Sequence, residues 1–256
     1  HIKHRFRKLA LSLHPDRIQR EKDLEYKTSA TSFHQIQQAY DYLLRGKEVG
    51  SRMLYKVANG GKSISAVSEN IEQQKSNCLR VVLFGPESTG KTTMAKALAE
   101  FYETTWVPEF ARDYLQKKWD KDKSICTLKD LLVIAEGQMI SENKALVKAN
   151  KILFCDTNVL VTQAWSETHF DGYCDIQLKQ LSDTFQYDHY FLTGIDVPWK
   201  NDDLRDRPEE RDLMFRHFEN LLKQKNVSYS YLIGSHENRL KSAIKDINSL
   251  INQRIV

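Results

Sequence analysis

The chemically most informative stretch of the chain covers residues 85–92. Its sequence, GPESTGKT, fills every fixed position of the pattern G-x-x-x-x-G-K-[ST]. The glycines let the backbone turn tightly and aim its N–H groups at phosphate oxygens, and the start of the helix expected next favours negative charge. Lys91 would reach the β- and γ-phosphates, and the Thr92 hydroxyl would bind Mg²⁺. We therefore predict a nucleoside triphosphate site at Gly85, Pro86, Glu87, Ser88, Thr89, Gly90, Lys91 and Thr92.

A carboxylate, Asp156, ends the apolar run KILFCD at residues 151–156. If this run is a parallel strand of the same sheet, Asp156 reaches the sheet edge that holds the phosphate loop, where ligands collect. Asp156 would then bind Mg²⁺, directly or through water. The alternative is a structural role at the N-cap of a helix over 158–168, where Asp and Thr are both ordinary residues.

Glu109 and Arg112 stand three residues apart in WVPEFARDY, residues 106–114. On a helix this spacing places both side chains on one face. A carboxylate at the rim of the sheet can orient or deprotonate an acceptor hydroxyl, and a guanidinium can bind a phosphate or a ribose oxygen. A negative charge in the first turn of a helix is the structural alternative for Glu109. We predict that Glu109 is the base, with Asp156 as its rival.

The polar segment at 196–211, DVPWKNDDLRDRPEER, lies between an expected strand and an expected helix. Its arginines, Arg205, Arg207 and Arg211, would bring positive charge to a transferring phosphoryl group if the segment closes as a lid. The alternative is a solvated loop, because three aspartates nearly balance these charges. Trp199 favours a function, since an exposed Trp is unfavourable unless it packs on something.

Short apolar runs alternate with longer helical patterns from Leu79 onward. The runs are LRVVLF, TTWV, KILFC, HYFLTGI and SYSYLIG, and the helical patterns cover 91–103, 109–119, 127–149, 158–168, 208–223 and 236–251. Such alternation is typical of parallel strands joined by crossover helices. The predicted fold class is therefore α/β, with a central parallel sheet flanked by helices.

The chain divides into three predicted parts, 1–45, 46–78 and 79–256. In the first, two helical patterns flank His14-Pro15-Asp16 and predict a small helical hairpin. The second loses this periodicity, carries four glycines and ends in a polar run, which predicts a linker. The third holds the phosphate loop and the α/β pattern.

Composition and charge exclude several classes of protein. The chain has 256 residues, of which 41% are hydrophobic, and its four widely spaced cysteines suit reduced thiols in the cytoplasm. No apolar run is long enough to predict a membrane span. The first 50 residues hold 10 Lys/Arg against 6 Asp/Glu, whereas the rest holds 28 of each sign. We therefore expect neither a membrane nor a nucleic acid as partner.

Four motifs in the same order resemble the ribosylnicotinamide kinase domain of NadR-type proteins, over essentially all of 79–251. These motifs are LFGPESTGKTT, TTWVPEFARDYL, ILFCDTNVL and IDVPWKNDDLRDRPEER. The resemblance implies a P-loop kinase fold and the ATP-dependent phosphorylation of nicotinamide riboside on its 5′-hydroxyl, giving nicotinamide mononucleotide.

The resemblance also implies roles for individual residues. Those that would hold the ATP phosphates are Gly85, Gly90, Lys91, Thr92 and Thr93, with Mg²⁺ at Thr92 and Asp156. Those that would face the nucleoside or close over it are Glu109, Arg112, Arg205 and Arg207. An aromatic clamp on the nicotinamide ring would come from Trp106, Trp165 or Trp199; we assign Trp199 to substrate binding.

Residues 1–44 resemble the second and third helices of a DnaJ-type J-domain, in IKHRFRKLALSLHPDR and FHQIQQAYDYLL. The resemblance implies that His14, Pro15 and Asp16 stimulate a DnaK-type ATPase. It also implies that this ATPase is contacted by a basic face made of Lys3, Arg5, Arg7 and Lys8. The first J-domain helix is absent and the loop after the tripeptide is long. The segment is therefore either a truncated J-domain or a structural appendage.

Three classes of function fit these residues: a small-molecule kinase, a regulatory P-loop ATPase, and a co-chaperone with an accessory nucleotide-binding domain. Glu109, Arg112 and the lid favour the kinase, because an ATPase needs no acceptor site. The sequence leaves another nucleoside open as the acceptor.

Overall fold

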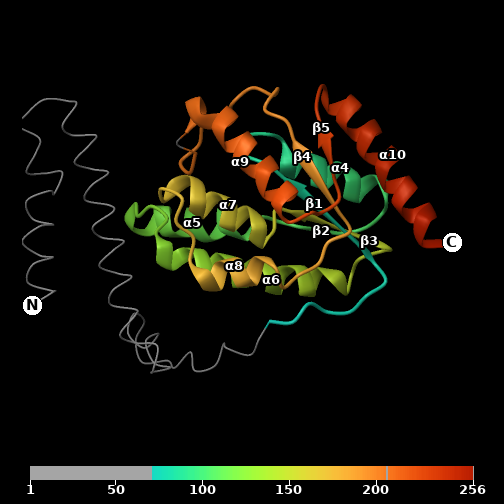
Figure 1. Cartoon of the computed structure of the whole chain (residues 1–256), viewed down its shortest axis with the longest axis horizontal. Helices are drawn as coiled ribbons and strands as arrows, with labels where there is room; N and C mark the ends of the chain where they lie inside the picture. The colour runs from blue at the N-terminus through green and yellow to red at the C-terminus, as the bar shows by residue number, and fades with distance from the viewer. Residues whose placement is uncertain (1–70, 206, 256) are drawn as a thin grey trace, which may run out of the picture. The chain divides into compact units, whose positions relative to one another are not determined.

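Five parallel strands form the centre of the computed structural model, which describes residues 71–205 and 207–255 (Figure 1). The strand order is β2-β3-β1-β4-β5. The strands are β1 (Leu79–Phe84), β2 (Trp106–Val107), β3 (Ile152–Asp156), β4 (His189–Thr193) and β5 (Tyr229–Leu232). All neighbouring strands pair in parallel, so their carboxyl ends meet at one edge of the sheet. The predicted α/β fold with a central parallel sheet is confirmed.

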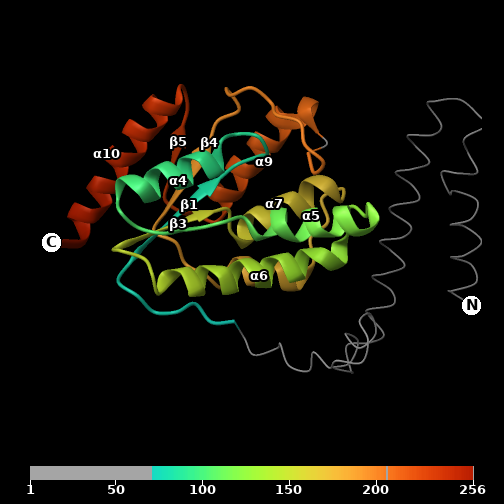
Figure 2. The ribbon, with the colours of Figure 1, turned by 180° about the vertical axis from the view of Figure 1, so that it is seen from behind.

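Helices cover both faces of this sheet, as Figures 1 and 2 show from opposite sides. The helices are α4 (Lys91–Phe101), α5 (Phe110–Asp122), α6 (Leu128–Leu146), α7 (Val159–His169), α8 (Ile176–Ser182), η1 (Pro208–Glu210), α9 (Arg211–Gln224) and α10 (His236–Ile255). Helices α4 and α10 share one hydrophobic core cluster with the sheet. Helices α6, α7 and α9 share a second cluster on the opposite face. This three-layer packing buries β1 completely. The phosphate loop begins directly after the last residue of β1, Phe84.

Helix α8 and the helix boundaries differ from the sequence pattern. Helix α8 has only seven residues and one fully buried side chain, Leu178, so it carries almost no helical periodicity. Its start is marked by Asp175, whose side chain accepts a hydrogen bond from the Gln177 N–H at 2.9 Å. Strand β2 is two residues long, because only Trp106 and Val107 pair with β3.

The segment at 71–78 precedes β1 without helix or strand and is bonded to the unit that follows. Gln73 donates to the Gln186 carbonyl at 2.8 Å and accepts from the Gln186 N–H at 3.0 Å. Asn143 of α6 accepts from the Gln74 N–H at 3.0 Å. The last eight residues of the predicted linker therefore contact the α/β unit directly.

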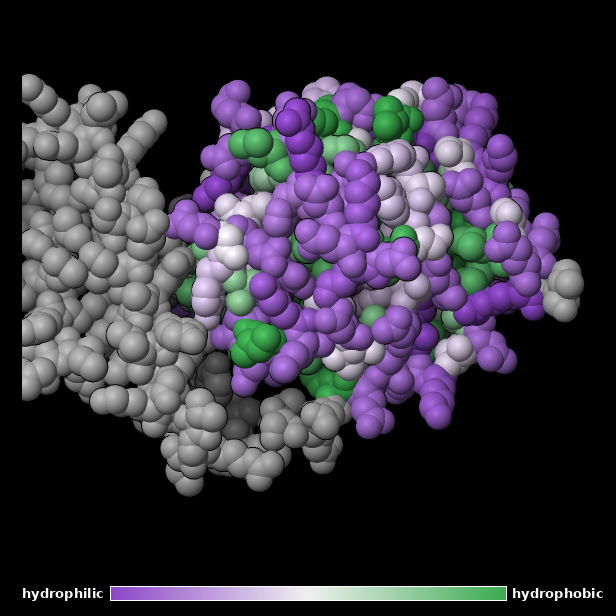
Figure 3. Space-filling view, viewed as in Figure 1, coloured by the Kyte–Doolittle hydropathy of each residue, from purple (hydrophilic) through white to green (hydrophobic). Residues whose placement is uncertain are grey.

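The predicted helical hairpin, with His14, Pro15 and Asp16, and the linker up to residue 70 lie outside the described residues. All four cysteines lie within them, and none of them forms a disulfide there. No helix in the described ranges is long and apolar enough to cross a membrane. The face seen in Figure 3 is mainly hydrophilic, with apolar side chains in small separate patches.

Candidate active site

The phosphate loop has the backbone conformation that its glycines predict. Gly85 has φ 139°, and Gly90, at the N-cap of α4, has φ 86°. A Cβ atom on Gly85 would lie 2.7 Å from the Thr193 hydroxyl oxygen, so no larger residue fits beside β4. The buried Thr89 hydroxyl fastens the loop, because it donates to the Pro86 carbonyl at 2.8 Å and lies 2.6 Å from the Thr193 hydroxyl. These contacts and the two glycines therefore hold the loop in this conformation.

Arg239 supports the loop from α10. Its side chain is 2% exposed and donates to the carbonyls of Thr89 at 2.7 Å, Gly194 at 3.1 Å and Gly234 at 3.0 Å. It also pairs with Asp196, at the base of the predicted lid. The sequence pattern missed this residue, because nothing local distinguishes Arg239 from the other charged residues of an amphipathic helix.

Lys91 lies in the loop among three carboxylates. Its ammonium donates to the Pro86 carbonyl at 2.7 Å. Burial lowers the pKa of Lys91, whereas the negative charges of Glu109, Asp156 and Glu87 act in the opposite direction. A phosphate that takes the place of the Pro86 carbonyl would compensate this buried ammonium, as phosphoryl transfer requires.

Thr92 and Asp156 fit the Mg²⁺ site predicted for them. Thr92 is an exposed residue, and its hydroxyl donates to Asp156 Oδ2 at 2.5 Å. Asp156 is 1% exposed, and its Oδ1 has no hydrogen-bond partner among the described residues. Burial, and then the charge of Glu109, raise the pKa of this carboxyl to about 6. A buried carboxylate oxygen without a partner is unfavourable, and a cation would satisfy it.

The N-cap of α7 is Asn158, not Asp156. The Asn158 side chain accepts from the Val161 N–H at 3.3 Å and donates to the Tyr190 hydroxyl at 3.1 Å. The structural alternative for Asp156 is therefore wrong. No group of three or more His, Cys, Asp or Glu residues suited to a metal occurs in the described ranges. Mg²⁺ does not need one, since it keeps several waters and binds substrate phosphates.

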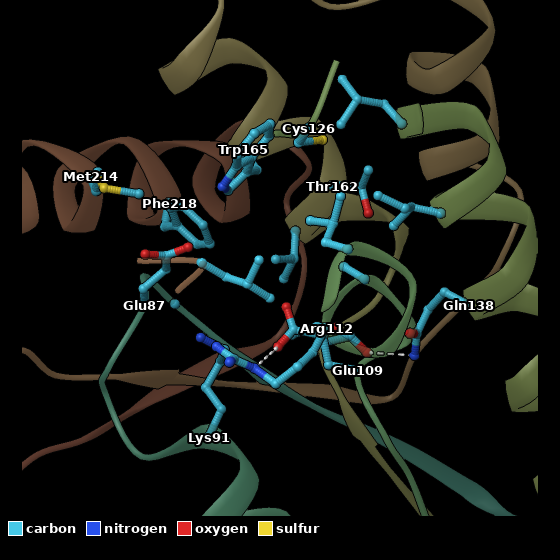
Figure 4. A pocket seen from close by; sticks show the side chains of 18 residues that line it. Glu87, Lys91, Glu109, Arg112, Cys126, Gln138, Thr162, Trp165, Met214 and Phe218 are labelled. Carbon is cyan, nitrogen blue, oxygen red and sulfur yellow. Dashed lines mark hydrogen bonds and ion pairs between the residues drawn. The ribbon is translucent and has the colours of Figure 1, made fainter. Parts of the chain in front are cut away.

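Glu109 and Arg112 lie together on the pocket side of α5 (Figure 4). Glu109 is the N-cap residue of α5, and its side chain makes no capping bond to the described backbone. Its Oε2 lies 3.9 Å from Arg112 Nε, and Arg112 Nη1 lies 3.0 Å from Asp202 Oδ2 in the predicted lid. The Glu109 carboxylate is thus available to the pocket, although it stands at a helix start.

A pocket with an open mouth extends from the phosphate loop between α5, α6, α7 and α9 (Figure 4). Its polar end holds Glu87, Lys91, Glu109 and Arg112. Its other end is mostly apolar and is lined by Leu115, Cys126, Leu131, Ile134, Val161, Thr162, Trp165, Leu204, Met214 and Phe218. Such a shape suits a molecule with a polar sugar and a flat apolar base.

Trp165 is the tryptophan that lines this pocket. Its ring stacks on His169 with centroids 4.0 Å apart, which fixes its orientation. Trp106 packs against the core on the α4 side of the sheet. Trp199 lies under Arg211, whose guanidinium is 5.7 Å from the ring centroid, and is not part of the pocket lining. Of the three candidate tryptophans, Trp165 is therefore the one placed at this pocket.

The predicted lid segment lies against the phosphate loop. The Lys200 N–H donates to the Ser88 hydroxyl at 2.8 Å. Arg211 donates to the Ser88 carbonyl at 3.1 Å and to the Val197 carbonyl at 2.9 Å. Arg211 thus joins the two segments, a role that its place in a charged run did not reveal.

The two lid arginines assigned to catalysis lie in different places. Arg205 is near enough to Lys91 for its charge to help lower the lysine pKa. Arg207 instead donates to the Thr168 carbonyl at 3.1 Å and pairs with Glu210 at 2.8 Å, outside the pocket lining. In this conformation only the first of the pair is placed beside the phosphate loop.

Two family models match the chain. The model described as AAA domain matches residues 80–239, and the model described as DnaJ domain matches residues 1–49. Two curated relatives carry the name trifunctional NAD biosynthesis/regulator protein NadR. The protein of Salmonella typhimurium is 30% identical over 156 residues, and that of Escherichia coli is 32% identical over 155 residues. The matched regions are 59% and 58% of this chain, but only 37% of each relative.

Solved structures share the fold. NadR protein in complex with NAD and AMP-PNP superposes with a TM-score of 0.56 and NadR protein in complex with NR with 0.54, both at 20% identity and over 67% of this chain. These matches cover 49% and 51% of those chains. A deoxyadenosine kinase from M. mycoides superposes with a TM-score of 0.51 at 12% identity, over 67% of this chain and 100% of that one. The predicted resemblances to NadR-type and DnaJ-type proteins are confirmed.

Proposed function

This chain belongs to the AAA domain family, and from that premise we propose that it is an ATP-dependent kinase that phosphorylates nicotinamide riboside on its 5′-hydroxyl. The observation that carries the proposal is the pocket that continues from the phosphate loop into an apolar cavity. A P-loop ATPase needs only water as acceptor. A partly open pocket with an apolar end that is lined by a tryptophan is instead suited to an organic acceptor.

The phosphate loop and Lys91 bind the triphosphate in the proposed reaction. The 5′-oxygen of the nucleoside forms a bond to the γ-phosphorus as the bond from this phosphorus to the β–γ bridging oxygen breaks, and ADP leaves. Glu109 orients the attacking hydroxyl and accepts its proton. Lys91 and Arg205 supply positive charge beside the transferring group. Thr92 and Asp156 would hold Mg²⁺, which neutralises phosphate charge when bound.

Nicotinamide riboside is supported as the acceptor by three observations. The curated relatives are named for NAD biosynthesis, and a NadR structure with the same fold contains NR. Within this chain, Trp165 offers a flat aromatic face at the apolar end of the pocket. Such a face suits the flat, positively charged pyridinium ring of this nucleoside. Use of ATP and four free thiols favour a cytoplasmic enzyme.

The proposal is tested by incubating the protein with ATP, Mg²⁺ and a panel of nucleosides and identifying each product by mass spectrometry. Nicotinamide riboside should be phosphorylated with the highest kcat/KM. Trp165→Leu should raise the KM for the nucleoside, because the nicotinamide ring loses the aromatic side chain on which it stacks. Trp119→Leu is the matched control, since Trp119 lies on α5 outside the pocket lining. ATP hydrolysis without any phosphorylated nucleoside would instead identify a regulatory ATPase.

The DnaJ match favours a second activity for the N-terminal part. We propose that residues 1–45 form a separate module that stimulates a DnaK-type ATPase through His14, Pro15 and Asp16, joined by the segment 46–78 to the kinase unit 79–256. The test is single-turnover ATP hydrolysis by a DnaK-type chaperone in the presence of the full chain or its His14→Gln variant. Stimulation by the wild type alone supports the proposal, and equal rates with both proteins contradict it.

A further inference from the structure

We infer that Gln138 is a positioning residue that sets the place of Glu109 relative to Asp156, an inference that rests on the proposed kinase function. The two carboxylates follow different strands, since Glu109 stands between β2 and α5 and Asp156 ends β3. Gln138 lies in the middle of α6 and is 2% exposed. Figure 4 shows its side chain at the wall of the pocket beside Glu109.

The amide of Gln138 bonds to the turns that carry both carboxylates. Its Oε1 accepts from the Phe110 N–H, directly after Glu109, at 2.9 Å. Its Nε2 donates to the Thr157 carbonyl, directly after Asp156, at 3.3 Å. With both ends of the amide engaged in a buried place, the side chain has one favourable orientation. Gln138 therefore links the two turns through a single planar group.

Gln138 also takes over the capping of α5. The first N–H groups of a helix have no partner within the helix, and the side chain of the N-cap residue usually accepts one of them. Here the N-cap is Glu109, whose carboxylate makes no such bond to the described backbone. Gln138, which lies on another helix, accepts the hydrogen bond of the Phe110 N–H. The Glu109 carboxylate therefore remains available to the hydroxyl group of a substrate in the pocket.

Gly137, the residue before Gln138, lets α5 approach this closely. A Cβ atom on Gly137 would lie 2.3 Å from the ring of Phe110. The Phe110 ring therefore packs directly on the backbone of α6, while the Phe110 N–H bonds to the neighbouring side chain. Two consecutive residues of α6 thus hold both the backbone and the side chain of the first residue of α5.

The second turn needs support because its backbone is strained. Thr157 has φ 75°, a left-handed conformation that is unfavourable for a β-branched residue. Such strain persists only where surrounding contacts hold it. The Thr157 N–H donates to the Leu83 carbonyl at 3.2 Å, and its carbonyl accepts from Gln138. Gln138 thereby helps to keep Asp156 directed at Thr92.

The test compares Gln138→Met with the wild-type full chain. Methionine keeps the length and helix propensity but makes neither amide bond. We expect kcat to fall roughly 10- to 100-fold, as for a catalytic group displaced by about an ångström, with the KM for ATP within about twofold. The matched control is Gln163→Leu, since Gln163 is also buried and bonded at both ends of its amide but lies outside the pocket lining.

Hydrogen exchange read by mass spectrometry gives an answer that does not depend on the acceptor. In Gln138→Met, amides at 109–112 should exchange faster than in wild type, whereas those at 116–120 should not change, because Asp130 binds Lys118 at 2.7 Å. Unchanged exchange at 109–112, or a loss of kcat no larger than in Gln163→Leu, would overturn the inference. If the wild-type protein phosphorylates no nucleoside, that result contradicts the proposed function. The hydrogen-exchange result then still tests whether Gln138 holds the start of α5.

If Gln138→Met does not fold, Gln138→Glu is the second variant. It keeps an oxygen that accepts the Phe110 N–H. Amides at 109–112 should then exchange as slowly as in wild type, while those at 155–158 should exchange faster. Fast exchange at 109–112 in this variant would show that the Gln138 side chain does not hold the start of α5.

Discussion

The buried carboxyl group of Glu142 should make the protein less stable as the pH rises. Glu142 lies on α6 and is 2% exposed, and its Oε2 accepts from the Tyr187 hydroxyl at 2.9 Å. Burial raises the pKa of this carboxyl from 4.5 to about 8, against smaller opposing effects that include the Tyr187 hydrogen bond and the Arg80 charge. Glu142 is therefore mostly neutral in the folded protein at pH 7.

The sign and the size of the effect follow from the two pKa values. The unfolded chain releases this proton near pH 4.5, whereas the folded protein keeps it until about pH 8. The stabilisation that the proton brings is complete below pH 4.5 and is lost as the pH rises to about 8. At about 1.4 kcal/mol for each pKa unit, the free energy of unfolding should fall by roughly 4–5 kcal/mol over this window through Glu142. This is a large part of the stability of an ordinary domain.

Urea denaturation of wild type and Glu142→Gln at several pH values between about 5 and 8 measures this effect. The variant should gain stability relative to wild type by several kcal/mol across this range, because other titrating groups contribute equally to both proteins. Glu100→Gln is the control, since Glu100 is an exposed residue of α4, and its curve should run parallel to wild type.

A Glu142→Gln curve parallel to the wild-type curve would refute the reasoning. It would show that Glu142 is charged in the folded protein, and that polar neighbours or water compensate for its burial.

Three further predictions concern the proposed chemistry. Lys91→Ala should lower turnover by orders of magnitude with the fold intact. Lys96→Ala is the control and should not lower turnover, because Lys96 lies on the same helix but beside Trp106. Near wild-type rates for Lys91→Ala would contradict the phosphate-loop assignment. Glu109→Gln should lower kcat by roughly 10²–10⁴ with little change in ATP binding. Asp156→Asn should raise the Mg²⁺ concentration that activity needs. If the two variants showed each other's effects, the assignment of Glu109 as the base and Asp156 as the metal ligand would have to be exchanged. A chain of residues 71–256, which keeps the contacts of Gln73 and Gln74, should retain full kinase activity, and loss of activity would place the N-terminal part in the catalytic unit.

The phosphate loop and the strands could be predicted from the sequence because their information is local. The two glycines and the lysine of the loop act through the backbone of a few consecutive residues, so their spacing alone predicts the turn. Strand β1 is buried on both faces, and this appears as a continuous apolar run. The positions of Lys91, Asp156 and Glu109 at one sheet edge follow from parallel strands, which the alternation with helices already indicated.

The contacts that complete the site depend on residues far apart in the chain. Arg239 bonds to the phosphate loop across 150 positions, and Gln138 bonds to Phe110 across 28. Of the candidate tryptophans, Trp165 reaches the pocket because α7 packs beside α6, while Trp199 lies under Arg211. Such contacts arise from the packing of helices and the direction of single side chains, and neither leaves a periodic pattern in a short window of sequence.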